Sequence, residues 1–174
     1  VAISHPRSGK LWRSGFLPSK FQGTQFSPDE TAPEKMIRYL KNPVQDKAAQ
    51  RQQLDLIQQL NGLHLADRST DGFLEGRIQA METAFRMQFA ASKAFDVRAE
   101  TKSVRKLYGE NTFGNSCLLA RRLVERGVRY VQIMMKGQPW DTHTNNVANT
   151  KSCCAQTDQP VGALLADLQQ RGLL

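Results

Sequence analysis

The sequence has no long apolar run, and it is short of cysteine and of acidic side chains. No stretch approaches the roughly 18 apolar residues of a membrane-spanning helix, and the first twenty residues lack the apolar segment of a signal peptide. The three cysteines include an adjacent pair and form no C-x-x-C motif, which argues against a disulfide framework and a structural zinc site. We therefore expect no membrane span.

The charge is unbalanced toward lysine and arginine. The chain has 24 Lys and Arg against 16 Asp and Glu, a net charge of +8 over 174 residues. A basic surface attracts nucleic acid, sulfated sugars or phosphate esters. The simpler interpretation is a solvated basic surface without a dedicated partner.

The first 43 residues are rich in glycine and proline and show no helical or alternating period. They are expected to form a loop-rich segment. A loop of that length is unusual in a free-standing domain and predicts a larger body on which it lies.

Apolar periodicity predicts five helices after this segment. Leu56, Ile57, Leu60 and Leu63 form one stripe, and Met81 and Phe85 belong to a second that we assign to core packing. Asp71 is a candidate N-cap, and the turn at residues 69–72 predicts a helical hairpin. The expected helices span residues 44–66, 72–92, 101–108, 113–126 and about 157–171.

Residues 128–135 are the one clear strand, which we expect to be buried. A loop at about 136–152 follows before the last helix. One strand cannot make a sheet, so its partners lie outside this sequence or in segments without a recognisable pattern. The fold class expected is α/β, in a mostly helical interior fragment.

Asp141 and His143 follow this strand in the loop. Sites in open α/β sheets gather beyond the carboxyl ends of strands. In an extended segment residues i and i+2 point to one side, so the carboxylate and imidazole face one metal or two neighbouring ones, which suits zinc or manganese. The alternative is that Asp141 caps a turn and His143 lies in solvent. Two ligands do not complete a site.

Other candidates for chemistry are weaker. His64 follows Leu63 on a helix and is expected to be a hydrogen-bonded core or boundary residue, and His5 has no partner in view. Ser116 lies inside a helix without the setting of an activated nucleophile, and Cys117 is expected to fill the core. The nucleophile elbow, the phosphate-binding P-loop and the dinucleotide glycine fingerprint are absent.

Several longer motifs follow one another along nearly the whole chain. They include an L-W-R-S-G-F-L-P-S-K-F-Q-G stretch, an A-F-R-M-Q helix and a C-L-L-A-R-R-L-V-E-R-G-V-R signature. In order, the motifs occupy residues 11–23, 84–88, 107–109, 115–130, 140–143, 158–160 and 167–174. Together they resemble a bacterial sulfatase-like family, known as domain of unknown function 1501, of the alkaline-phosphatase and sulfatase superfamily.

The resemblance implies an alkaline-phosphatase-like fold in which residues 1–174 are part of a single domain. The segments would be the loop-rich 1–43, a helical insertion and helix at 44–127, and strand, metal loop and helix at 128–174. It places Asp141 and His143 at the metal-bearing end of the central sheet, with zinc, manganese, magnesium or calcium as the cofactor. It also implies an exported, periplasmic protein. The family's upstream nucleophile strand and downstream G-E-F-G-R-T and G-R-D-H motifs are absent, as is a Cys-x-Pro-x-Arg or Ser-x-Pro-x-Arg sulfatase signature.

Three functional hypotheses follow. The first is a metal-dependent hydrolase of sulfate or phosphate esters, acting on an anionic small molecule or a polysaccharide ester and completed by the remainder of its own domain. The second is a catalytically silent binding or scaffold protein of the same fold that recognises anionic polysaccharide. The third and least favoured is nucleic-acid binding through residues 7–20, where Trp12 and Phe16 interleave with cations. The 174-residue chain alone is expected to turn over neither ester.

Overall fold

The computed structural model describes residues 1–3, 15–17, 21–37, 44, 46–67 and 72–174. Asp71, the predicted turn before it, His5 and Trp12 lie outside these residues. Helices dominate the described part, and three two-residue strands form a small parallel sheet. In chain order the elements are β1 (Ala2–Ile3), β2 (Gln25–Phe26), α1 (Pro33–Met36), α2 (Lys47–Asp67), α3 (Gly72–Phe95), the 3₁₀ turn η3 (Val97–Ala99), α4 (Lys102–Tyr108), α5 (Thr112–Val124), β3 (Gln132–Ile133) and α6 (Asn146–Gln170).

The sheet has the order β2-β1-β3, with Ala2 opposite Gln25 on one side and Gln132 on the other. The strand expected at 128–135 is shorter than predicted, since only Gln132–Ile133 is strand, and it is half-buried rather than buried. Its partner strand β1 lies in the segment expected to be loop, which is one of the two places expected for a partner: outside the sequence, or in a segment without a recognisable pattern. Two-residue strands show no alternation of apolar residues, so the sequence could not reveal them.

The core lies between the sheet and the helices α3, α5 and α6. Ile3 and Phe26 bring the strands into it and are almost fully buried. The rings of Phe26 and Phe95 pack at 4.4 Å between centroids, which ties β2 to the end of α3. Leu118 and Leu119 of α5 are fully buried at the centre. Together these contacts fix α5 behind the sheet.

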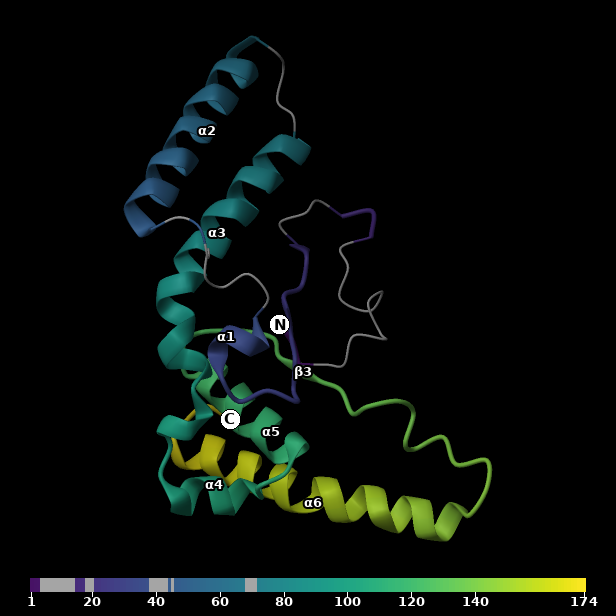
Figure 1. The fold of residues 1–174 in the computed structure, drawn as a ribbon. Coiled ribbons are helices and arrows are strands. Elements are labelled where there is room, and N and C mark those ends of the chain that lie inside the picture. Colours follow the sequence, from purple (N-terminus) through teal and green to yellow (C-terminus); the bar gives the residue numbers. More distant parts are fainter. Residues whose placement is uncertain (4–14, 18–20, 38–43, 45, 68–71) are drawn as a thin grey trace.

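Helices α2 and α3 project together from this body (Figure 1). Arg51 of α2 joins Glu82 of α3 at 3.0 Å, and its guanidinium lies 5.1 Å from the centre of the Phe85 ring. Of the predicted stripe, Leu56, Leu60 and Leu63 are 56%, 56% and 71% exposed, whereas Ile57 is half-buried. Arg51 and Gln58 of α2 lie against Glu82 of α3, so most of the stripe faces away from α3.

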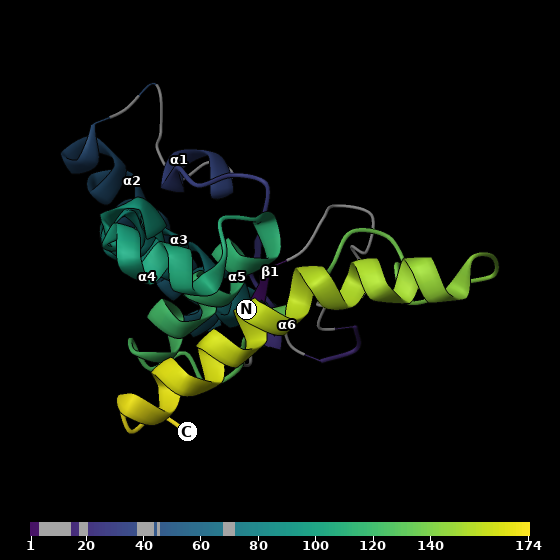
Figure 2. The same ribbon diagram turned by 90° about the horizontal axis from the view of Figure 1, so that it is seen from below.

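The longest helix, α6, runs alongside α4 and α5 and extends beyond them at its N-terminal end, as the view from below shows (Figure 2). It begins at Asn146, whereas the sequence predicted a loop to about residue 152 and a helix from about 157. Pro160 lies inside the helix and is fully buried. Among the described residues, no helix combines the length and the hydropathy needed to cross a membrane.

Candidate functional site

The carboxyl ends of the three parallel strands meet at one edge of the sheet. Ser27, Pro28 and Asp29 follow β2 at this edge, and Met134, Met135 and Lys136 follow β3. The first turn of α5 lies against the same edge, since Thr112 and Phe113 line a hollow with these residues. Ligand sites of open α/β sheets lie at such an edge.

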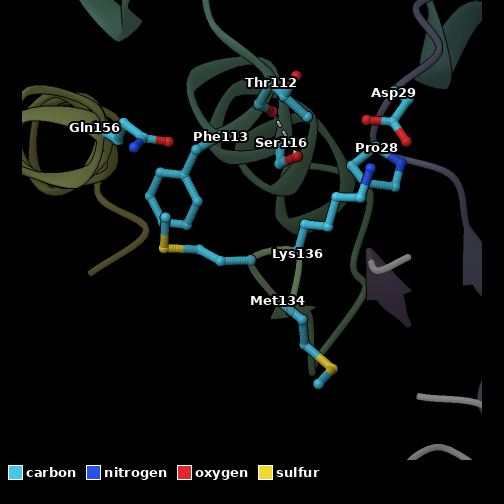
Figure 3. A pocket seen from close by; sticks show the side chains of 9 residues that line it. Pro28, Asp29, Thr112, Phe113, Ser116, Met134, Lys136 and Gln156 are labelled. Carbon is cyan, nitrogen blue, oxygen red and sulfur yellow. Dashed lines mark hydrogen bonds between the residues drawn. The ribbon is translucent and has the colours of Figure 1, made fainter. Parts of the chain in front are cut away.

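A polar hollow of about 200 Å³ opens there. Lys136 points toward Pro28 and Asp29, while Met134 points to the other side (Figure 3). Ser116 is buried beneath the hollow, and its hydroxyl donates a hydrogen bond of 2.8 Å to the carbonyl of Thr112. This hydrogen bond lies within α5, so the hydroxyl of Ser116 has its partner in its own helix.

The loop from β3 to α6 carries the predicted ligands. Gly137 and Asn145, near its two ends, have positive φ angles of 73° and 51°. The amide of Asp141 donates to the carbonyl of Gln138 at 3.0 Å, which forms a tight turn just before the carboxylate. The Thr142 hydroxyl bonds Asn146 at the start of α6 at 2.5 Å. Hydrogen bonds within the loop and to the start of α6 therefore define the conformation of the loop.

The structure brings Asp141 and His143 together. Oδ2 of Asp141 lies 3.2 Å from Nε2 of His143, and the side chains are 54% and 84% exposed. The i and i+2 argument predicted this juxtaposition. In the described part of the chain, no group of three or more His, Cys, Asp or Glu side chains could hold a metal ion. Metal binding by the pair stays a prediction.

A second, larger cavity, which we call the apolar groove, reaches Asp141. Its volume is about 680 Å³, and Asp141 is one of its lining residues. The buried thiol of Cys153 donates to the carbonyl of Pro139 at 3.2 Å and so fastens the loop to α6. Phe113, Met134 and Met135 line both the groove and the polar hollow, which makes the two cavities neighbours.

The sequence missed most of these cavity residues. Lys136 follows the predicted strand directly, so the rule that sites lie beyond strand ends could have found it. Asp29 could not be found, because β2 has no recognisable pattern. Phe113 packs against the core and also lines the apolar groove, and Val161 of α6 lines the groove as well.

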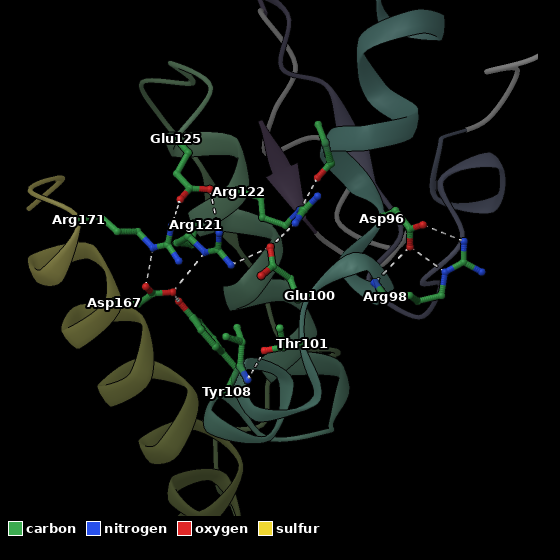
Figure 4. Close-up of polar contacts among 12 residues, drawn as sticks. Asp96, Arg98, Glu100, Thr101, Tyr108, Arg121, Arg122, Glu125, Asp167 and Arg171 are labelled. Atoms are coloured by element: carbon green, nitrogen blue, oxygen red, sulfur yellow. Dashed lines mark hydrogen bonds and ion pairs between the residues drawn. The ribbon is translucent and has the colours of Figure 1, made fainter.

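A network of buried charges lies behind the site and joins α4, α5 and α6 (Figure 4). Arg121 is 2% exposed and contacts Glu100, Glu125 and Asp167 at 3.0, 2.8 and 3.3 Å. The hydroxyl of Tyr108 donates to Asp167 at 2.8 Å. Glu125 lies one helical turn from Arg121, whereas Glu100 and Asp167 are distant along the chain and could not be assigned to it from the sequence.

Burial and charge shift the acidity of this network. Burial acts to raise the pKa of Asp167, but hydrogen bonds from Arg171 and Tyr108 and the charge of Arg121 lower it below the ordinary value. The pKa of Glu100 is lowered in the same way, since Arg122 and Arg121 outweigh the effect of its burial. These carboxylates are ionised structural groups rather than proton donors.

Two other predicted residues have different outcomes. Cys117 fills the core as expected, and burial raises the pKa of its thiol to about 12, which leaves it unreactive. His64 was expected at a core or boundary position and is exposed on α2. His64 is exposed for the same reason as Leu63, since both lie on the face of α2 that points away from α3.

The described fold defines a mixed α/β protein that is mostly helical, with a small parallel sheet and cavities at the carboxyl edge of its strands. The chain belongs to the family described as protein of unknown function (DUF1501), which it matches over residues 2–174. No curated protein and no solved structure matches it.

Proposed function

We propose that this chain contributes Asp141 and His143 to the divalent-metal site of a sulfatase-like hydrolase, with an alkaline-phosphatase-like fold, that acts on sulfate or phosphate esters. The observation that supports the proposal is the 3.2 Å approach of Oδ2 and Nε2 in the loop beyond a parallel strand, where Asp141 also lines a groove. Zinc, manganese, magnesium and calcium are the candidate ions. We also propose that the protein is exported to the periplasm.

The donor set fits such an ion. Zinc binds imidazole nitrogen and carboxylate oxygen at about 2.0–2.2 Å, which at a tetrahedral angle separates two ligands by about 3.3–3.6 Å. The two donors of the pair lie 3.2 Å apart, slightly closer than that spacing. A bound divalent ion would polarise the ester oxygen and offset the charge that develops in the transition state.

The protein residues have defined tasks in this proposal. Asp141 supplies negative charge and His143 a neutral nitrogen donor. The Gln138–Asp141 turn and the thiol of Cys153 hold the loop in place. Two protein ligands are fewer than the three of a common catalytic zinc site, so the remainder of the domain supplies the others.

Metal stoichiometry tests the proposal. In the full-length protein, Asp141→Ala and His143→Ala should each weaken metal binding by at least the roughly 10–100-fold that follows loss of a residue bonded to a ligand. Elemental analysis after gel filtration counts the bound metal. His64→Gln, at an exposed histidine on α2, is the matched control and should keep the wild-type content. An unchanged metal content in both loop variants would contradict the assignment of Asp141 and His143 as ligands.

Turnover separates the hydrolase from a silent scaffold. The metal-loaded full-length protein should hydrolyse an aryl sulfate or an aryl phosphate, and both loop variants should lose that activity because the ion is lost with them. A protein that binds the metal through the pair but hydrolyses neither ester contradicts the hydrolase and favours a scaffold that binds anionic polysaccharide.

A further inference from the structure

The lining of the apolar groove indicates which part of a substrate it can bind. Its largest side chains are Phe113 and Trp140, and Met134, Met135 and Val161 add apolar surface. Among the described residues that line it, the polar side chains are Gln138, Asp141 and Thr157, and none is basic. The groove is therefore a mainly apolar surface with one acidic group, Asp141, in its lining.

This chemistry disfavours a sugar in the groove. A sulfated or phosphorylated polysaccharide would bring hydroxyl groups that find few partners on such a lining, and unpaired polar groups cost free energy when they leave water. The repeated anionic groups of a polysaccharide would also find no cation in the lining of the groove, since Lys136 lines the polar hollow instead.

The size and character of the groove suit a small apolar group. Its volume of about 680 Å³ lies within the range of roughly 300–1,000 Å³ that is usual for small-molecule sites. Aromatic rings stack on aromatic side chains, and methionine adapts its shape and makes favourable contacts between sulfur and an aromatic ring. An aromatic or alkyl group of one or two rings is the occupant that this lining recognises.

We propose that the apolar groove binds the uncharged aromatic or alkyl alcohol portion of an ester whose sulfate or phosphate faces Asp141 and His143. This inference rests on the proposed function for the position of the acid group. Binding of the apolar portion in the groove can be tested separately from the metal site, because it needs no metal.

The experiment measures binding to the full-length protein in EDTA by calorimetry. The probes are 1-naphthyl sulfate and glucose 6-sulfate, which have the same charge and differ in the alcohol portion. The naphthyl ester should bind at least about tenfold more tightly, since the aromatic ring leaves water for an apolar lining. Equal affinity for the two probes overturns the inference.

Two neighbouring variants on α6 localise the binding. Val161 lines the groove, whereas Leu165, one turn further on, does not, and both are partly exposed, at 41% and 51%. Val161→Gln should weaken the binding of 1-naphthyl sulfate roughly tenfold, because it places an amide against the ring. Leu165→Gln should bind like wild type, and equal effects of the two variants would contradict the assignment.

Two outcomes distinguish the inference from the proposed function and from a protein partner. Naphthyl binding that survives in Asp141→Ala, together with unchanged metal content, refutes the metal site and leaves the groove assignment standing. A groove filled by a second copy of the chain would exclude the naphthyl ester, and Val161→Gln would then convert a dimer to a monomer in sedimentation, which overturns the inference.

Discussion

At the scale of single residues, Gly114 shows how closely the backbone packs next to the site. A Cβ atom at this position would lie 2.2 Å from the carbonyl oxygen of Gly109 and 2.3 Å from that of Tyr108. Backbone atoms at such distances have to move. We therefore expect Gly114→Ala to lower the free energy of unfolding by about 1–3 kcal/mol, the usual cost of overpacking, as measured by denaturant titration.

The control for this prediction is another helical glycine. A Cβ at Gly162 of α6 would meet no heavy atom within 4 Å. Gly162→Ala should stabilise the protein by about 0.5–1 kcal/mol, because alanine loses less backbone entropy on folding. If both variants change stability by the same amount and sign, the close approach at Gly114 does not govern the effect.

The sequence predicts contacts between residues that are close along the chain better than contacts between distant ones. The proximity of Asp141 and His143 and the burial of Cys117 follow from local spacing, and the structure has both. The partners of Arg121 do not follow, because Glu100 and Asp167 reach it only through tertiary packing. Residues of the candidate site from separate elements could therefore not be assembled from the sequence.

At the scale of elements, the pairing of α2 with α3 depends on few contacts. Arg51 donates two hydrogen bonds of 3.0 Å to Glu82 and also contacts Asp55 and the ring of Phe85. We expect Arg51→Gln to raise the hydrogen-exchange rates of α2 amides, with α5 and α6 unchanged, since regions with few contacts open locally.

Arg86→Gln is the matched control for the hairpin. Arg86 contacts the same Glu82 at 3.3 Å, but its side chain is 78% exposed. Exposed ion pairs contribute little to stability, so exchange in α2 should stay close to wild type. Faster exchange across α5 and α6 in Arg51→Gln would mean that the hairpin and the body unfold as one unit.

Elements differ in how well the sequence predicts them. The expected boundaries of α2, α3, α4 and α5 lie within three residues of those found, because each has an apolar stripe or a clear cap such as Gly109 after α4. The sequence did not reveal the first turns of α6, because that segment is polar and shows no apolar stripe. The strands β1 and β2 were too short to show a period.

At the scale of the whole molecule, the buried charge network joins elements that are distant in the chain. Asp167 of α6 accepts hydrogen bonds from Tyr108 of α4 and Arg171, and it pairs with Arg121 of α5. Removing one member of a buried ion pair leaves the others without compensation. The α4–α5–α6 layer that supports the candidate site therefore depends on the ionised form of its carboxylates.

The pH dependence of stability should report this network. The pKa values of Glu100 and Asp167 in the folded protein lie below their ordinary values of 4.5 and 3.8. A carboxylate with a lowered pKa stabilises the fold above its ordinary value, and that contribution disappears as the pH falls through the lower folded value. The free energy of unfolding should therefore be level near neutral pH and decline below about pH 4.5, as denaturant titrations across that range will measure.

Asp167→Asn tests whether the network is the cause of this decline. The variant should lose about 3 kcal/mol near neutral pH, since Arg121 and Arg171 lose a buried anionic partner, and its stability should fall less steeply in acid. Asp158→Asn, at an exposed position on the same helix, should keep the wild-type stability and the wild-type slope. Equal slopes for wild type and Asp167→Asn would show that other carboxylates govern acid unfolding. The charge network would then be a feature of packing that contributes no pH-dependent stability.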